Sequence, residues 1–405
     1  MIDRRLLKNF DYPILLAVLF LILIGIMVIF SATTKQNVFQ TYFIRQSYWF
    51  LASIVIFIII LSVNYEAFVR WAYIYYGLSI FSLLLVFFFP PVAGARRWLI
   101  FGSFLRIQPA ELAKLGLIMA LGRYLGKKQG KINNFKELCI PVIIVLIPVL
   151  LIFKQPDLGS ALTFIPIFIG MLYINGLPSL YLFFLVSPLI SFILFNWFYL
   201  WLFYMVIFGA VLWWINRNRV DSVIVLSINI LCGILSPKLW SFLKGYQKRR
   251  LLAFLNPELD PLGSGYHLIQ SKIAIGSGGF LGKGPMAGTQ CRLDFLPAQH
   301  TDFIFSVIGE ELGFIGSIFV ILLFSFIILR GIDIAVKAKD IYGTLISVGI
   351  LSVFTFHIIV NIGMTVGIMP ITGVPLPFIS YGGSSLMGFM IMMALLINIG
   401  MRRFD

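Results

Sequence analysis

The chain has 405 residues, of which 60% are hydrophobic and 12% are charged, and its formal net charge is +15. With a mean hydropathy of +0.99, it carries more apolar surface than a soluble domain of this length could bury. Long apolar runs with few charges are typical of a polytopic membrane protein. The basic residues form short clusters between these runs, which favours anionic lipid over nucleic acid as their partner. The three cysteines do not suggest a disulfide framework, and no CxxC or HExxH spacing indicates a metal site.

Apolar runs of about 20 residues predict membrane-spanning helices. The first run is too long for a signal-peptide core and lacks a small-residue cleavage site, so we expect a retained helix. We predict an all-α polytopic membrane protein, a single domain over 1–405 that forms a bundle of about 10–12 transmembrane helices. The lower number applies if region 178–236 holds one span instead of three. The predicted helices are 12–31, 47–64, 72–90, 111–125, 138–153, 160–175, 178–195, 198–215, 221–236, 303–329, 341–368 and 380–401.

Lysine and arginine gather in the short connections on the side that holds the N-terminus. Because such connections face the cytoplasm, both termini are expected there. This orientation places a large extracytoplasmic loop, 237–302, before the antepenultimate helix. The basic connection around Arg217 and Arg219 supports three helices in region 178–236, and a helix with an interfacial hairpin is the alternative.

The outer loop is dense in glycine, hydroxyl and amide residues and ends at Asp302. Its glycines could present backbone N–H groups to phosphate. Asp302 opens the next helix, where it is either a first-turn acid that the helix dipole stabilises or a catalytic carboxylate. A stripe of small residues on that helix favours an acid that points into a bundle cavity. The candidate substrate-binding residues of this loop are Gln270, Ser271, Lys283, Gln290, His300 and Thr301.

Further acids have two open interpretations. Glu310 and Glu311 lie about 12 Å along the predicted helix 303–329, either as structural ion pairs or as functional groups. Asp157 precedes another helix, as a cap or as a catalytic group.

Two other polar segments contribute candidates. Arg97, Trp98, Glu111 and Lys114 surround the start of the fourth helix, where they form either a local ion pair and an interfacial anchor or a binding site for an anionic ligand. His357 and Asn361 are expected to be polar contacts between helices. A dense Pro/Gly segment from 367 to 385 predicts rigid non-helical backbone that lines a cavity and presents Ser380 and Tyr381.

Taken together, these segments resemble the SEDS family (shape, elongation, division and sporulation) over nearly the whole chain, and the elongation members more than the division members. Region 178–236 is longer than usual for that family by about one helical pair, which makes it an extra or variable part. The motifs that carry the resemblance are Arg-Arg-Trp at 96–98, Gln-Pro-Ala-Glu at 108–111, Gln-Pro-Asp-Leu-Gly-Ser at 155–160, 260–271, 295–305 and 374–385.

The resemblance implies a peptidoglycan glycosyltransferase of the cytoplasmic (inner) membrane. Such an enzyme polymerises lipid II at the outer face of that membrane and works with a class B penicillin-binding protein as its transpeptidase partner. Lipid II, the polyprenyl-linked glycan strand and membrane lipids are therefore the expected partners, with no nucleic acid. The family's essential acid falls on Asp302, and its other motif positions fall on Arg97, Trp98 and Glu111.

The chemistry of sugar transfer fits these residues. A general base must take a proton from the acceptor hydroxyl, for which Asp302 is the candidate. Developing charge on a lipid pyrophosphate would meet Arg97, Lys114, Lys283 and loop amides, with a divalent cation as the open alternative and no protein metal site. One base without an evident nucleophile favours inversion. The rival hypotheses are a lipid II flippase and a scaffold for an enzyme partner.

Overall fold

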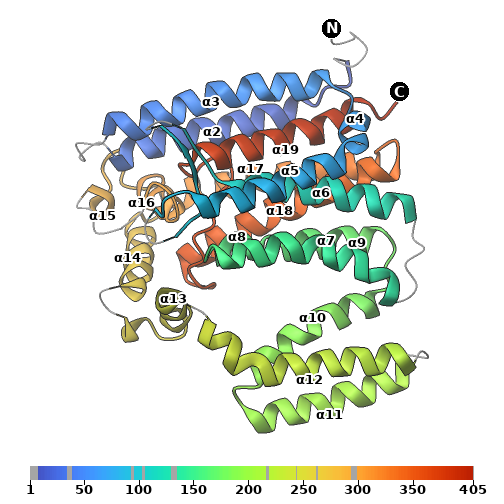
Figure 1. Cartoon of the computed structure of the whole chain (residues 1–405). Helices are drawn as coiled ribbons and strands as arrows, with labels where there is room; N and C mark the ends of the chain where they lie inside the picture. Colours follow the sequence, from blue (N-terminus) through green and yellow to red (C-terminus); the bar gives the residue numbers. More distant parts are fainter. Residues whose placement is uncertain are drawn as a thin grey trace.

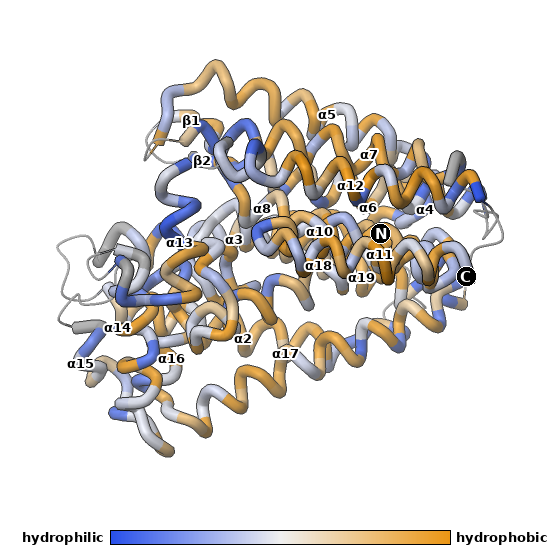
Figure 2. The backbone as a smooth tube through the Cα atoms, turned by 90° about the horizontal axis from the view of Figure 1, so that it is seen from below, coloured by the Kyte–Doolittle hydropathy of each residue, from blue (hydrophilic) through white to orange (hydrophobic). Residues whose placement is uncertain are grey.

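The structure is a computed structural model that describes residues 8–33, 39–92, 95–102, 105–128, 135–215, 219–242, 244–260, 263–292 and 299–404. It is a helical bundle in which α2 begins and α19 ends at the same end, opposite the end that carries α13 to α16 (Figure 1). Hydrophobic residues dominate the long helices, and hydrophilic residues gather at the two ends of the bundle (Figure 2).

The main bundle is organised around α18 and α19. In their apolar windows 67% and 83% of residues are buried, against 22% to 44% in the other long apolar helices of the described chain. Asn398 of α19 donates hydrogen bonds to the main-chain oxygens of Ile60 and Val63 at the end of α3, so α19 is also fixed by polar contacts. The main-bundle helices are α2 (Tyr12–Thr33), α3 (Phe39–Ser62), α5 (Ala72–Leu85), α6 (Pro109–Lys128), α7 (Phe135–Lys154), α9 (Phe164–Ile174), α17 (Gly313–Val336), α18 (Ile341–Val366) and α19 (Gly383–Met401).

Short elements connect these helices. An antiparallel hairpin, β1 (Leu99–Phe101) and β2 (Leu105–Ile107), precedes α6, with Leu99 opposite Ile107. The remaining connecting elements are α4 (Tyr65–Arg70), η1 (Val86–Phe88) and α8 (Leu158–Leu162).

The three apolar runs of region 178–236 form three helices, α10 (Ser179–Leu194), α11 (Phe198–Ile215) and α12 (Arg219–Phe242). They lie apart from the main bundle (Figure 1). The three helices also contact one another: the Asn229 amide of α12 donates to Ser187 Oγ of α10 at 2.8 Å. Their shared apolar cluster consists of Phe184, Phe208, Leu212 and Val225. The region is therefore a packed trio of helices, one for each of its three apolar runs.

The polar stretch predicted as an outer loop is largely helical where the structure describes it. Gln270 and Ser271 belong to a helix, so their side chains have fixed directions. The stretch contains α13 (Gly245–Leu255), η2 (Pro257–Leu259), α14 (Ser264–Ser277) and α15 (Thr289–Arg292), and α16 (Ile304–Glu311) follows it.

The predicted single helix 303–329 is wrong because the chain breaks between α16 and α17. Gly313 at the break has a φ of +65°, the left-handed conformation that glycine adopts readily. The glycine-rich turn 278–284 fills the corner, and Lys283 N donates to Glu310 O at 3.0 Å. A Cβ on Gly313 would lie 2.2 Å from Gly282 N. These two glycines therefore permit close approach of two backbones.

The fold class is confirmed. Within the described ranges, seven helices are long and apolar enough to cross a membrane, and four shorter apolar helices accompany them. The protein is thus an all-α polytopic membrane protein.

We predict that Gly313→Ala destabilises the protein by about 1–3 kcal/mol, because it combines a left-handed backbone with a steric clash. Thermal unfolding in detergent would measure the loss. Gly77→Ala is the matched control, since a Cβ at Gly77 in α5 meets nothing within 4 Å. Equal melting temperatures for both variants would contradict the proposed role of the corner.

Candidate active site

The turn that carries Asp302 is fixed by the Pro/Gly segment between α18 and α19. Ser380 Oγ donates to Thr301 O at 2.7 Å and accepts from Leu376 N at 2.8 Å. Tyr381 N donates to His300 O at 2.9 Å. Ser380 and Tyr381 were predicted to contact substrate, and the structure places them directly against this turn, where Ser380 holds its backbone.

Asn361 completes the attachment from inside α18. Its side-chain amide donates to Asp302 O at 3.1 Å and to Val374 O at 2.8 Å. The residue is fully buried, and both amide hydrogens are used. The expected polar helix contact is therefore a contact to the Asp302 backbone and to the Pro/Gly segment.

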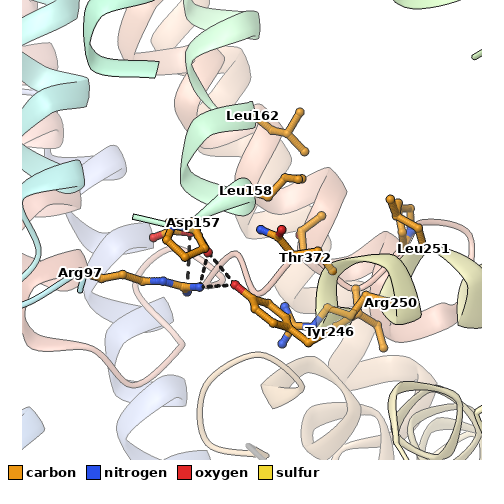
Figure 3. Close-up of a pocket in the computed structure, with 12 residues that line it drawn as sticks. Arg97, Asp157, Leu158, Leu162, Tyr246, Arg250, Leu251 and Thr372 are labelled. Atoms are coloured by element: carbon orange, nitrogen blue, oxygen red, sulfur yellow. Dashed lines mark hydrogen bonds and ion pairs between the residues drawn. The ribbon is translucent and has the colours of Figure 1, made fainter. Parts of the chain in front are cut away.

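A cavity of about 70 Å³ opens beside this turn (Figure 3). Arg97, from the segment before β1, points into it and donates to Tyr246 Oη at 3.0 Å and to Pro156 O. The Arg97 guanidinium also lies 3.8 Å from a carboxylate oxygen of Asp157. The cavity is lined by Arg97, Pro156, Asp157, Leu158, Leu162, Tyr246, Gln247, Arg250, Leu251, Pro370, Ile371 and Thr372.

Asp157 is the N-cap of α8, as one of its two interpretations predicted, because its carboxylate accepts from Ser160 N at 3.3 Å. Gln108 Nε2 and Ser160 Oγ donate to its second oxygen at 3.0 and 2.9 Å. These donors satisfy the carboxylate and fix it at the cavity wall.

Asp302 lies on the far side of Gly373 from Arg250. A Cβ on Gly373 would be 3.3 Å from both Arg250 Nη1 and Asp302 Oδ2, so glycine leaves the space between the two charges open. Burial raises the pKa of Asp302 above its usual value, and the guanidinium groups of Arg250 and Arg97 oppose that rise. A carboxylate with a raised pKa is a better proton acceptor near neutral pH.

Sequence reasoning missed Tyr246 and Arg250 as site residues. Both residues belong to the basic run 244–250, which forms part of the helix α13. What no local pattern shows is that α13 packs its Arg250 towards the Asp302 turn. The alternation of basic and apolar residues is the only signal that could have raised the question.

Lys114 is placed in the core between α6 and α18. Its ammonium donates to Glu111 Oε1 at 2.7 Å and lies 3.2 Å from His357 Nε2. His357 Nδ1 is 3.0 Å from Pro375 O, and a carbonyl only accepts, so Nδ1 carries the proton and Nε2 accepts from Lys114. The three charged or polar groups are at most 3% exposed. The network links Lys114 to the Pro/Gly segment that holds the Asp302 turn.

Trp98, the remaining candidate of this segment, lies half-buried directly before β1.

Lys283 and Gln290 are placed at the corner between α16 and α17, and not at the cavity. A single oxygen of Glu310 accepts from Lys283 Nζ at 2.8 Å, Thr289 N at 2.7 Å and Gln290 N at 3.0 Å. Glu310 is fully buried. The amides expected to face phosphate therefore face a carboxylate of the protein, and Glu310 forms the structural ion pair that one interpretation predicted.

Ser271 also has a structural partner. It donates to Thr365 O at 2.6 Å, so the 2.6 Å contact with Ser306 Oγ is donated by Ser306. Ser271 and Ser306 are buried between α14, α16 and α18. Gln270 is half-buried on α14.

No group of three or more His, Cys, Asp or Glu side chains in the described ranges could hold a metal ion. Asp157 and Asp302 are the two carboxylates near the cavity. The charge of Asp157 helps to raise the pKa of Asp302, but the two carboxylates do not form a ligand set of that kind.

The structure is a polytopic helical bundle that sets the half-buried Asp302 near the guanidinium groups of Arg250 and Arg97 at one end, and its apolar helices are those of an integral membrane protein. The sequence profile of the cell cycle protein family FtsW/RodA/SpoVE matches residues 12–206 and 201–404. The chain therefore belongs to that family. The two matches meet within α11, in the helical trio.

Named relatives agree with this membership. The peptidoglycan glycosyltransferase RodA of Treponema pallidum is 37% identical over 434 residues, covering 98% of this chain and 99% of the relative. The peptidoglycan glycosyltransferase MrdB of Escherichia coli K12 is 34% identical, covering 96% and 93%.

Solved structures share the fold. A chain from a peptidoglycan synthase complex, described as coordinating polymerization and crosslinking, has a TM-score of 0.74 at 28% identity and covers 98% of this chain and 99% of that one. The rod shape determining protein RodA of Thermus thermophilus has a TM-score of 0.65 at 24% identity, with 98% of each chain covered. At 24% identity, the likeness to the Thermus thermophilus protein supports the fold alone.

We predict that Lys114→Met destabilises the protein by about 3–5 kcal/mol, because it leaves the Glu111 carboxylate buried without its partner. The double variant Glu111→Leu/Lys114→Met should recover most of the loss, as measured by thermal unfolding. Lys128→Met is the control: its ion pair with Glu137 is exposed and 3.7 Å long, so we expect a change within about 1 kcal/mol. Additive effects of the two core substitutions would contradict a coupled buried pair.

Proposed function

We propose that this protein is a peptidoglycan glycosyltransferase that polymerises lipid II, with Asp302 as the general base. The observation that carries the proposal is the Asp302 carboxylate, which is held by its backbone and shares the space beside Gly373 with Arg250, a residue that lines the cavity together with Arg97. The activity borne in the names of the two relatives described above supports it.

The reaction joins an acceptor hydroxyl to an anomeric carbon. The Asp302 carboxylate takes the hydroxyl proton as the new C–O bond forms, while the bond to the pyrophosphate breaks and the pyrophosphate leaves with the electron pair. Arg97 and Arg250 supply positive charge at the cavity for that leaving group. Arg97 is held before the reaction by Pro156, Tyr246 and Asp157, so it needs little reorganisation as charge develops.

Inversion at the anomeric carbon is the simpler course. A retaining mechanism needs a second carboxylate as nucleophile. Asp157 is the nearest candidate, but Ser160 and Gln108 already donate hydrogen bonds to its two oxygens. Its role is to cap α8 and to fix Arg97.

The side of the membrane on which the cavity lies follows from the orientation predicted for the helices. With both termini in the cytoplasm, the α13 to α16 end and its cavity face the outer side of the cytoplasmic membrane, where lipid-linked sugar is polymerised. A class B penicillin-binding protein is the proposed partner. The chain from a complex that couples polymerization to crosslinking supports such an assembly.

Asp302→Asn tests the proposal because it keeps the shape of the side chain and removes the base. With the full chain, its transpeptidase partner and purified lipid II, we expect glycan formation to fall by about 10²- to 10⁴-fold. Asp333→Asn is the control, since the Asp333–Lys337 pair is a surface i,i+4 contact. A folded Asp302→Asn protein that still polymerises lipid II would refute the mechanism. Lipid II translocation without polymer by the unsubstituted protein would indicate a transporter.

The activity is expected to change with pH in a defined direction. The ionised carboxylate is the active form of Asp302, so activity falls as pH falls through its pKa. Arg250 lowers this pKa, and Arg250→Gln should therefore shift the acid limb of the kcat/KM profile to higher pH. Arg249→Gln, at an exposed neighbour on α13, should leave the limb in place. A shift to lower pH with Arg250→Gln would contradict the assignment.

A further inference from the structure

A second polar surface shares the turn that carries Asp302. The rings of Tyr42, His300 and Tyr381 form a three-way contact, with centroid distances of 4.6 Å for Tyr42–His300, 4.9 Å for Tyr42–Tyr381 and 5.7 Å for His300–Tyr381. All three side chains are half-buried. They come from the first turns of α3, from the turn itself and from the Pro/Gly segment.

Two guanidinium groups stand beside these rings. Arg45 of α3 hydrogen-bonds to the Tyr381 side chain, and Arg45 and Arg106 both lower the pKa of Tyr381 against the raising effect of burial. Arg106, in β2, is exposed. Tyr42, Arg45, Arg106, His300 and Tyr381 are called the aromatic–arginine cluster below.

The cluster is separate from the cavity but fixed to the same backbone. None of its five residues lines the cavity. Tyr381 N donates to His300 O at 2.9 Å, two residues before Asp302. The Asp302 turn therefore joins the two surfaces: its His300 ring belongs to the cluster, and its Asp302 side chain approaches Arg250 of α13 at Gly373.

The side chains of the cluster suit an anionic sugar. Aromatic rings present flat apolar faces with polar edges, which match the face of a sugar ring and its hydroxyl groups. Guanidinium groups bind phosphate or carboxylate in a forked geometry. Burial lowers the pKa of His300, so its ring is neutral at pH 7 and can both donate to and accept from hydroxyl groups.

We infer that the aromatic–arginine cluster binds the acceptor glycan, while the Arg97/Arg250 cavity binds the pyrophosphate of the donor. The inference rests on the proposed function, because joining two lipid-linked sugars requires two sites on either side of one base. The acceptor hydroxyl loses its proton to Asp302 and bonds to the anomeric carbon of the donor. The donor pyrophosphate leaves into the cavity with the electrons of the broken bond.

The test separates the two substrates. A lipid II whose acceptor hydroxyl is chemically blocked can act only as a donor. With this blocked lipid II saturating, unblocked labelled lipid II is titrated, and the initial rate of formation of the first glycosidic bond gives the acceptor KM. The reverse titration of blocked lipid II gives the donor KM. Both use the full chain with its transpeptidase partner.

We expect Arg45→Gln and Arg106→Gln each to raise the acceptor KM by about tenfold, the effect of ~1.4 kcal/mol, with the donor KM and kcat within about twofold. Arg250→Gln should raise the donor KM instead. Lys238→Gln, at an exposed lysine of α12, should change neither. Because Arg106 is exposed, its substitution tests the site without risk to folding.

Two outcomes overturn the inference. If the cluster variants leave the acceptor KM unchanged, the cluster does not bind the acceptor. If they raise the donor KM as much as the acceptor KM, the two surfaces form one site. Absence of product from the unsubstituted protein would instead refute the proposed glycosyltransferase function, so the two failures are distinguishable.

Discussion

The structure depends on keeping one carboxylate, that of Asp302, at the end of an apolar helical bundle. Desolvation of Asp302 is unfavourable to its charged form, yet the proposed reaction needs that form. The protein reconciles these demands by fixing the backbone with neutral hydrogen bonds from Asn361 and Ser380 and by placing Arg250 at a distance that Gly373 sets. A direct ion pair with Arg250 would lower the pKa of Asp302 further and make its carboxylate a weaker proton acceptor.

Glu310, near the other end of the short helix α16, is held in a different way. It accepts three close hydrogen bonds from Lys283 and the backbone of the glycine-rich turn, which stabilises its charge and removes it from proton transfer. Both ends of α16 are thereby anchored, one through Glu310 and the other through the Asp302 turn. The two acids differ in their donors: a lysine, a hydroxyl and two backbone amides hold Glu310, whereas the side-chain hydrogen bond given for Asp302 comes from the neutral Thr301.

The sequence predicted the parts of this fold that local pattern determines. Apolar runs predicted the helices, including all three of α10 to α12. The expectation that Asp302 opens a helix is wrong, because Asp302 lies in the turn before α16 and Phe303 is the N-cap. The break at Gly313 was missed because the hydrophobic pattern continues through it. The glycine-rich turn was taken for a phosphate cradle because glycine indicates close backbone approach without showing what approaches. The approach of Arg250 to Asp302 is a long-range contact, which no local pattern encodes.

The same distinction between local packing and long-range contacts separates the helical trio from the Asp302 turn. The helical trio packs around its own cluster of Phe184, Phe208, Leu212 and Val225, and none of its residues lines the cavity. The trio therefore makes no direct contribution to the cavity lining. By contrast, the Asp302 turn receives hydrogen bonds from α18 and from the Pro/Gly segment, and the network around Lys114 reaches that segment through Pro375. A change in any of these elements would therefore be transmitted to the backbone of Asp302, the proposed base.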